Sequence, residues 1–311
     1  MPQMTPAQAR VIDPILTEVA RGYQNAAYIG NALFPVVPVG LRGGKILQFG
    51  KEHFRLYNTA RAPGSDVAVI QFGYAGQSYA LADHAIAGLV PVEDLEEASQ
   101  QPGIDLGSDA VRSVQDIIAI KLEVEQATLA RNAALYAASN KATLSGASQW
   151  SDPSSDPIKA IEDAKEAIRG QVVMRPNTLV LGPKVFAALK QHPKIIDRIK
   201  YTGRDVPTAE LLASLFGVQR VVSGDAVYQD ADGVMVDVWG KDAILAYTNL
   251  SGIASRRVPS YGYTYRLRNF PVVETPWYNP AKLSWMYPVR DAMSAVLAGA
   301  EAGFLFQNAV A

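Results

Sequence analysis

Histidine, cysteine and activated serine supply most acid–base, metal and nucleophilic chemistry, and this sequence presents none of them in a usable spacing. The three histidines, His53, His84 and His192, are widely separated, and no two have the spacing of metal ligands. The absence of cysteine excludes a thiol nucleophile, a disulfide and a zinc–thiolate centre. A Ser–His–Asp triad comes together only in the fold, but no Gly-x-Ser-x-Gly segment is present to expose its serine. We therefore expect no catalytic residues.

Two short segments have some features of ligand-binding loops. Gly40–Ile46 contains glycines and Lys45, as a phosphate loop does, but the spacing is wrong and no Ser or Thr follows the lysine. We interpret it as a glycine bend that enters a hairpin. Asp230, Asp232 and Asp237 lack the ligand series and closing glutamate of a calcium loop, and Asp230–Gly233 is typical of a turn. We expect neither a metal nor an organic cofactor.

Two clusters of side chains are better explained by structural roles, as a solvated patch and as strand packing, than by catalysis or nucleic-acid binding. The acidic cluster is Glu93, Asp94, Glu96 and Glu97. Paired carboxylates can act as acid and base, but consecutive acids near a helix start are typical of a solvated patch. The aromatic set is Tyr261, Tyr263, Tyr265 and Trp277. Such rings can stack on single-stranded nucleic acid, but strict alternation favours packing of strands.

The composition is that of an ordinary globular protein. The 311 residues are 49% hydrophobic, and 29 basic against 30 acidic residues give a net charge of -1. Such a balanced charge gives no overall attraction to phosphate backbones, so we expect no sequence-directed nucleic-acid binding. No export signal and no apolar run long enough for a bilayer is present, so we expect a protein that is neither exported nor in a membrane.

The first third of the chain predicts an arm followed by a hairpin. Asp13-Pro14 begins a short helix, and the prolines in Asn31–Val39 favour an extended arm. Alternating residues in Lys45–Phe49 and Val67–Tyr74 then predict two strands, with the turn at Asn58–Asp66.

The segment from Ser108 to about Ser139 has neither proline nor glycine and repeats apolar residues at helical spacing. It predicts one helix of roughly 45 Å, which would act as a strut.

The remainder predicts a compact α/β unit and returning strands. Asp156-Pro157 begins a helix that Gly170 is expected to end, and Thr178–Leu181 is a buried strand. A further helix, Leu211–Phe216, is expected between a Thr208 cap and Gly217. Strands are also expected at Val218–Val222, Val234–Val238, Ala243–Tyr247, Tyr261–Tyr265, Val272–Val273 and Leu283–Val289. The α/β unit is therefore inserted in a second unit that contains the strut.

This order of elements resembles the major capsid protein of tailed bacteriophages with the Hong Kong ninety-seven type fold. The resemblance covers nearly the whole chain and is carried by the order of phrases that are family-like and not catalytic. These phrases are Asn31–Pro35, Gly50–Phe54 with Arg61–Gly64, Thr178–Leu189 and Val238–Ala243. The resemblance implies an α+β fold with five parts: an N-arm (1–39), an extended E-loop hairpin (40–83), a peripheral domain with a long spine helix (84–155), an axial α/β domain (156–255) and returning strands that complete both domains (256–311).

The resemblance also implies a function. The chain would be a structural subunit, not an enzyme, that self-assembles into hexamers and pentamers of an icosahedral phage head around double-stranded DNA. It would be found in the virion after assembly in the host bacterial cytoplasm. The portal protein would be a partner, and separate scaffolding and decoration proteins are further candidates. Lys51 lies in the hairpin, but nothing marks the asparagine and glutamate that some members use for a covalent crosslink.

Two alternatives remain. An encapsulin-like nanocompartment subunit would share the fold, with a shorter hairpin and an amino-terminal helix at a cargo groove; the extended Phe34-Pro35 arm favours the phage interpretation. An α/β enzyme with a nucleotide site would need the phosphate loop that is absent.

The charges predict where copies meet. The hairpin is basic. Its basic residues are Arg42, Lys45, Lys51, Arg55 and Arg61, and we count only Glu52 and Asp66 as acidic residues in the same stretch. We expect it to dock on the acidic cluster of an adjoining copy. The loop Tyr201–Pro207, with Lys200, Arg204 and Asp205, is the candidate for the centre of a ring of copies.

Overall fold

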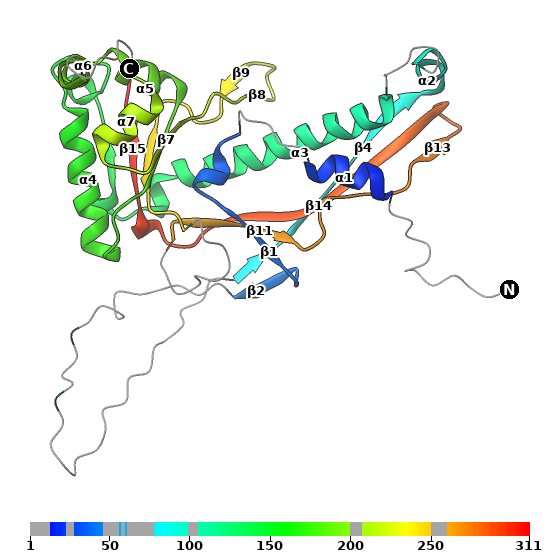
Figure 1. The fold of residues 1–311 in the computed structure, drawn as a ribbon, viewed down its shortest axis with the longest axis horizontal. Helices are drawn as coiled ribbons and strands as arrows, with labels where there is room; N and C mark the ends of the chain where they lie inside the picture. The colour runs from blue at the N-terminus through cyan, green and yellow to red at the C-terminus, as the bar shows by residue number, and fades with distance from the viewer. Residues whose placement is uncertain are drawn as a thin grey trace.

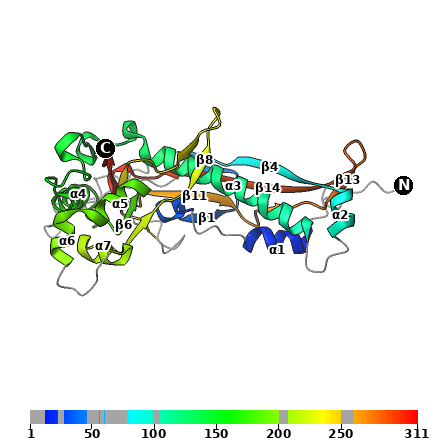
Figure 2. The same ribbon diagram turned by 90° about the horizontal axis from the view of Figure 1, so that it is seen from above.

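The computed structural model describes residues 13–22, 28–45, 56, 60, 78–98, 105–199, 207–249 and 260–311. The molecule is elongated, with an α/β unit at one end and a long sheet crossed by one helix extending from it (Figures 1 and 2). Strand β14 and helix α3 run together along most of this length. The α/β unit and the far tip of the sheet therefore lie at opposite ends.

The long sheet is built around β14 (Ser284–Leu297), a strand of 14 residues. Its antiparallel partners are β4 (Ala82–Pro91), β11 (Gly262–Leu267), β12 (Val272–Val273) and β13 (Trp277–Asn279). Strand β1 (Val36–Val39) adds to β11 in parallel. The sequence predicted a strand only at Leu283–Val289, because the alternation continues through small residues that carry a weak signal.

Helix α3 (Leu106–Arg131) lies against one face of this sheet. The Asp105 side chain begins it by accepting the backbone N–H groups of Gly107 (3.1 Å) and Ser108 (3.2 Å). With residues of α1, β12 and β14, its inward row forms a buried cluster of Leu16, Ala20, Val111, Val114, Ile118, Leu122, Val273, Val289, Met293 and Ala295. Burial of this row holds the helix on the sheet.

The predicted end of the strut helix near Ser139 is wrong. Asn132 is extended, and its side chain accepts the N–H of Ala134 to begin a separate 3-10 turn, η3 (Ala133–Leu135). A local side-chain cap thus competes with the helix although no proline or glycine is present. The 26 residues of α3 span about 39 Å.

Two short helices flank the far end of α3. Helix α1 (Pro14–Gly22) packs on α3 and β12, and Asp13 Oδ1 accepts the N–H of Leu16 at 2.9 Å. Helix α2 (Val92–Ala98) follows β4 directly. A single 3-10 turn, η1 (Gly30–Ala32), precedes the arm strand β1.

The α/β unit contains a five-stranded sheet in the order β5-β15-β10-β6-β7. The strands are β5 (Lys141–Thr143), β6 (Thr178–Leu181), β7 (Arg220–Ser223), β10 (Ala243–Ala246) and β15 (Gly303–Gln307). The helices are α4 (Pro157–Val172), α5 (Pro183–Gln191), α6 (Pro193–Ile199) and α7 (Ala209–Phe216). The short turns are η4 (Ala138–Asn140), η5 (Gly146–Ser148) and η7 (Ala300–Ala302).

Several local predictions in this unit can be compared with the structure. The Thr178–Leu181 strand is confirmed, as is α7, which Thr208 caps and Gly217 ends at φ 59°. Gly170 does not end α4, which continues to Val172 before Val173 adopts the left-handed conformation at φ 60°. Helix α6 was not predicted, since its seven residues are too few for a periodic pattern.

Two hairpins complete the described structure. Strands β8 (Val227–Gln229) and β9 (Met235–Asp237) are joined by the predicted turn, in which Asp230 Oδ1 accepts the N–H groups of Asp232 and Val234. Strands β2 (Gly43–Lys45) and β3 (Ser78–Ala80) pair where the predicted E-loop hairpin begins and ends. Most of that hairpin, including its two predicted strands apart from Lys45, lies outside the described residues.

Candidate assembly surfaces

The described residues do not assemble an acid–base site around His192. Its ring is buried, with Nε2 3.1 Å from Ser155 Oγ and 3.3 Å from the carbonyl oxygen of Asp152. Its buried Nδ1 has no hydrogen-bond partner among the described groups, so no carboxylate orients the ring as a triad requires. Burial lowers the pKa of His192. The imidazole is a packing group that ties the 152–155 loop to the start of α6.

The other chemical candidates also have structural neighbours. His84 lies opposite Asp291, whose carboxylate binds Arg266 at 2.5 Å, and His53 lies outside the described residues. Tyr261 is buried against Phe34 and Tyr136, which confirms the packing interpretation of that tyrosine. Within the described ranges, no group of three His, Cys, Asp or Glu side chains could hold a metal ion. No helix among those residues is long and apolar enough to cross a membrane.

A buried carboxylate joins three parts of the molecule. Glu123 on α3 accepts the N–H of Ile29 (3.0 Å), the N–H of Gly30 (2.8 Å) and the indole N–H of Trp239 (2.7 Å). Burial raises its pKa, and the three hydrogen bonds oppose that rise. At Gly30 a Cβ would lie 1.9 Å from Gln126 Oε1, so a larger residue would require the Gln126 side chain to move. Glu123 thus fixes the arm and the α/β unit on the helix.

The last turn of α3 makes a second connection to the α/β unit. Arg131 donates to Asp242 Oδ2 at 2.6 Å and to the carbonyl of Val238 at 3.0 Å. The other oxygen of Asp242 accepts the N–H of Asn308 at 2.9 Å. The Asp242 carboxylate is mostly buried and bound through both oxygens, so losing one of these partners is energetically costly. These contacts define the angle between the helix and the α/β unit.

The base of the hairpin contains an ion pair within the chain. Arg42 pairs with Asp83, both exposed, and its contact with another copy stays a prediction. The sequence count missed this because Asp83 lies 41 residues away, at the other end of the hairpin. Lys45 is exposed, while Lys51, Arg55 and Arg61 lie outside the described residues. Tyr79 stacks on Tyr265 with ring centroids 4.5 Å apart, which holds the base on the long sheet.

The acidic cluster lies on α2 at the end of the molecule away from the α/β unit (Figure 1). All four side chains, Glu93, Asp94, Glu96 and Glu97, are exposed. The solvated-patch interpretation therefore agrees with the structure. The cluster and the described end of the hairpin are not brought together within one chain, since β2, which ends at Lys45, and α2 lie far apart (Figure 1).

An apolar row crosses the distal sheet on the face turned away from α3. Leu89, Met286 and Trp277 are direct partners on β4, β14 and β13. The adjacent positions Gly88 and Tyr287 contact α3, so this row faces the other side. Leu89 is 42% and Trp277 48% exposed. Sequence reasoning favoured strand packing for Trp277 over stacking on nucleic acid but missed the row, because strand register is not visible in the sequence.

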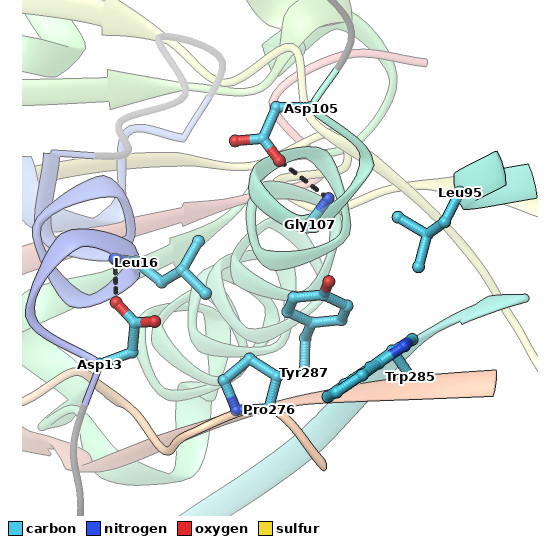
Figure 3. A pocket seen from close by; sticks show the side chains of 8 residues that line it. All are labelled: Asp13, Leu16, Leu95, Asp105, Gly107, Pro276, Trp285 and Tyr287. Carbon is cyan, nitrogen blue, oxygen red and sulfur yellow. Dashed lines mark hydrogen bonds between the residues drawn. The ribbon is translucent and has the colours of Figure 1, made fainter. Parts of the chain in front are cut away.

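A cavity lies at the same end on the α3 side of the sheet (Figure 3). Its volume is about 430 Å³, and it opens between α1, α2, α3 and β14. Its lining consists of Asp13, Leu16, Leu95, Asp105, Gly107, Pro276, Trp285 and Tyr287. No pattern in the sequence predicts this cavity, because its walls combine the start of α1, the α2–α3 region and the region of β13 and β14.

The predicted ring-centre loop lies almost entirely outside the described residues. Lys200 and residues 201–206, including Arg204 and Asp205, are not described, and Pro207 is buried. The position of this loop in an assembly stays a prediction.

Comparison with known proteins shows relatives along the whole chain. The profile of the family "Phage major capsid protein E" matches residues 135–258. The major capsid protein of Burkholderia phage BcepMu is 38% identical over 306 residues, which cover 97% of this chain and 98% of that protein. The crystal structure of a phage-related protein from Bordetella bronchiseptica RB50 is 45% identical, with a TM-score of 0.83, and covers 97% and 98% of the two chains.

More distant structures share the fold alone. The capsid of cyanophage P-SCSP1u gives a TM-score of 0.60 at 11% identity, covering 99% of this chain and 92% of that one. An encapsulin from Synechococcus elongatus PCC 7942 gives 0.54 at 14%, covering 96% and 95%. These neighbours confirm the α+β capsid fold of the Hong Kong ninety-seven type. With a relative of 38% identity along almost its entire length, the chain belongs to the family of phage major capsid proteins.

Proposed function

We propose that this major capsid protein assembles into closed rings of five and six copies that build an icosahedral head around double-stranded DNA. The observation that carries the proposal is the full-length relationship to a phage major capsid protein. The shape supports it, because an elongated chain with different ends favours head-to-tail interfaces, which close into rings. The loop 201–207 of the α/β unit remains the candidate for the ring centre.

The encapsulin alternative has weaker support. The encapsulin structure from Synechococcus elongatus is 14% identical to this chain, against 38% and 45% for phage-related proteins. An encapsulin shell and a phage head would also differ in content, cargo protein in one and DNA in the other. A purified particle can therefore be assigned from what it contains.

We assign no catalytic step to the chain. Its buried histidine lacks an orienting carboxylate, and its buried carboxylate at Glu123 is used to hold backbone N–H groups. The inferred partners are further copies of the chain, the portal protein and enclosed DNA that is held without sequence readout. Separate scaffolding and decoration proteins are further candidates. The inferred location is the virion, after assembly in the bacterial cytoplasm.

We place the main contact between copies at the distal end of the long sheet. The hairpin of one copy, with Lys45, Lys51, Arg55 and Arg61, would lie on the neighbour's apolar row beside the acidic helix α2. Leu56, 98% exposed, supplies an apolar side chain within that basic stretch. Charge would steer the hairpin to α2, while burial of Leu89 and Trp277 would supply most of the binding free energy.

Sedimentation and negative-stain microscopy of the purified chain test the proposal. A shell protein should run as capsomers or as a megadalton particle with five- and six-fold clusters. A small oligomer that never forms rings, under any salt or crowding condition tried, would contradict it.

A further inference from the structure

Strand β4 is an edge strand in the described part of the chain. It pairs with β14 along its whole length, from Ala82 opposite Met293 to Pro91 opposite Ser284. No other described strand pairs with β4, and Figure 2 shows it along the border of the long sheet. Alternate residues of an antiparallel strand direct their N–H and C=O groups away from the partner. The outer edge of β4 therefore offers a row of backbone groups that a further strand can bind.

This edge lacks the features that keep exposed edges unpaired. Such edges are usually short, or carry lysines and inner prolines. Strand β4 has ten residues, no lysine or arginine, and its one proline at the last position. Asp83 is its only acidic residue, and Ile86 near its middle is 40% exposed. A long apolar edge of this kind is typical of a strand that another chain covers.

Helix α3 adds apolar surface beside the edge. A Cβ at Gly88 would lie 3.0 Å from the Cβ of Ala110, so β4 and α3 are in close contact there. Ile86 shares the α3 face with Gly88, because side chains alternate along a strand. Ile117 follows Ala110 by seven residues, hence on the same side of the helix, and is 51% exposed. Ile86 and Ile117 therefore expose apolar surface on the α3 side of the open edge.

A second copy of β4 matches this edge. A row of backbone groups binds an extended strand, and β4 is itself extended with an open edge. Two copies paired antiparallel would be related by a two-fold axis perpendicular to the joined sheet. Directly opposed residues share a face, so this axis passes through one residue, which faces its own copy. An axis at Ile86 or Ala87 pairs nearly the whole strand.

The charges of β4 permit this pairing. With the axis at Ile86 or Ala87, Asp83 and its copy lie near opposite ends of the joined strands, roughly 20 Å or more apart. Salt largely screens exposed charges beyond about 10 Å. An in-register parallel pairing would instead place the two carboxylates side by side. The antiparallel arrangement is therefore the one that β4 favours.

The position of α3 also fits a second copy. The helix lies on both β14 and β4, so in the joined sheet the two α3 helices would be about two strand spacings apart, roughly 10 Å. Helices pack against each other at this distance. The exposed Ile117 side chains would then meet on the same face as the two Ile86 side chains. One contact would cover both residues.

We propose that β4 pairs antiparallel with β4 of a second copy around a two-fold axis at Ile86 or Ala87. The proposal rests on the proposed function and adds a second kind of contact to it. Contacts within a ring are head-to-tail, whereas a two-fold contact uses the same surface of both copies. The β4 contact would therefore join copies from neighbouring rings. It leaves the Leu89–Met286–Trp277 row, on the opposite face, open to the hairpin.

The absence of cysteine permits a direct crosslinking test in the full chain. Ile86→Cys and Ala87→Cys would be introduced singly, and assembled particles oxidised. A residue on the axis has its own copy about 5 Å away between Cα atoms, within the limit of about 7 Å for a disulfide. We expect a disulfide-linked dimer from one of the two variants and none from Ser214→Cys, at an exposed position on α7. No dimer from either β4 variant, or as much dimer from the control, would overturn the proposal.

A lysine on the edge gives a second test. Ile86→Lys should leave the chain folded by circular dichroism, because the side chain is partly exposed, but prevent edge pairing. We expect rings in sedimentation and micrographs and a loss of closed shells, whereas Ser214→Lys should form shells like the parent. Normal shells from Ile86→Lys would refute the β4 contact alone. Absence of rings from the parent protein would instead contradict the proposed function.

Discussion

The indole N–H of Trp239 donates a 2.7 Å hydrogen bond to Glu123 Oε1, and the two side chains are 0% and 2% exposed. Trp239 belongs to the α/β unit, while Glu123 lies on the helix that spans the long sheet. The same carboxylate holds the arm through Ile29 and Gly30. Three parts that are remote in sequence therefore depend on one side chain.

Replacing this carboxylate by an amide should destabilise the unassembled chain. In Glu123→Gln the amide nitrogen would face at least one N–H donor, which loses its acceptor inside the protein. We expect the free energy of unfolding to fall by about 1–3 kcal/mol in urea titrations. Lys121→Gln, at an exposed position on the same helix, is the control and should change little. Equal stability of both variants would show that the Glu123 contacts contribute nothing net.

Glu123 should also give a recognisable pH dependence. Burial raises its pKa above 4.5, so the folded chain binds a proton more readily than the unfolded chain. This contribution to stability is fully present below pH 4.5 and is lost as pH rises through the folded pKa. We expect the difference in unfolding free energy between wild type and Glu123→Gln to shrink with rising pH across that window. A difference that grows would mean that the hydrogen bonds outweigh burial.

His192 should give the free energy of unfolding the opposite dependence on pH. Burial lowers its pKa below 6.5, and protonation would place a second N–H on the unpartnered Nδ1. Its stability contribution is present above pH 6.5 and is lost as pH falls through the folded pKa, at up to about 1.4 kcal/mol per pH unit. We expect His192→Gln to flatten the unfolding curve on the acidic side of pH 6.5. An unchanged slope would show that another group dominates there.

Charge reversal tests the assigned contact between copies. Lys51→Glu with Arg55→Glu should block or misdirect shell formation at low salt, while circular dichroism shows a folded monomer. Adding Glu93→Lys and Glu97→Lys should partly restore assembly in electron micrographs. The control is Lys121→Glu with Lys159→Glu, an equal change in net charge at exposed sites elsewhere. Each exposed pair contributes only about 0.2–1 kcal/mol, so single reversals should have small effects. Normal, salt-insensitive shells from the first double variant would refute the charge contact.

Trp277→Ala tests the apolar part of the same contact. It should leave the unassembled chain folded, because the ring is half exposed, but raise the protein concentration needed for assembly. Met235→Ala, at a 63% exposed position on the β8–β9 hairpin, is the matched control. An unchanged critical concentration for Trp277→Ala would place the neighbour's hairpin elsewhere.

Local signals in the sequence were sufficient for elements with side-chain caps. Thr208 and Gly217 bound α7 as expected, because both act on adjacent backbone groups. Gly170 was misleading, since glycine ends a helix only where the backbone turns left-handed, and here Val173 does so. Asn132 ended the long helix through a cap that periodicity does not report.

The candidate sites were predictable only in part. The acidic cluster on α2 could be found because it is contiguous. The Arg42–Asp83 pair, the Leu89–Met286–Trp277 row and the distal cavity all require strand register between distant segments. Register follows from packing of the whole sheet, so no window of sequence contains it.

The position of β14 at the centre of the long sheet determines when the chain can fold. Strand β4 cannot pair until β14, about 200 residues later, has been synthesised. Likewise, Val36 on β1 cannot pair until Thr264 has been synthesised. At roughly 5–20 residues per second, a ribosome exposes these unpaired edges for tens of seconds before β14 emerges. Many copies made at once on neighbouring ribosomes would meet while their edges are open, and pairing between the wrong chains competes with folding. Production of this subunit should therefore be limited by protection of the nascent chain as much as by its synthesis.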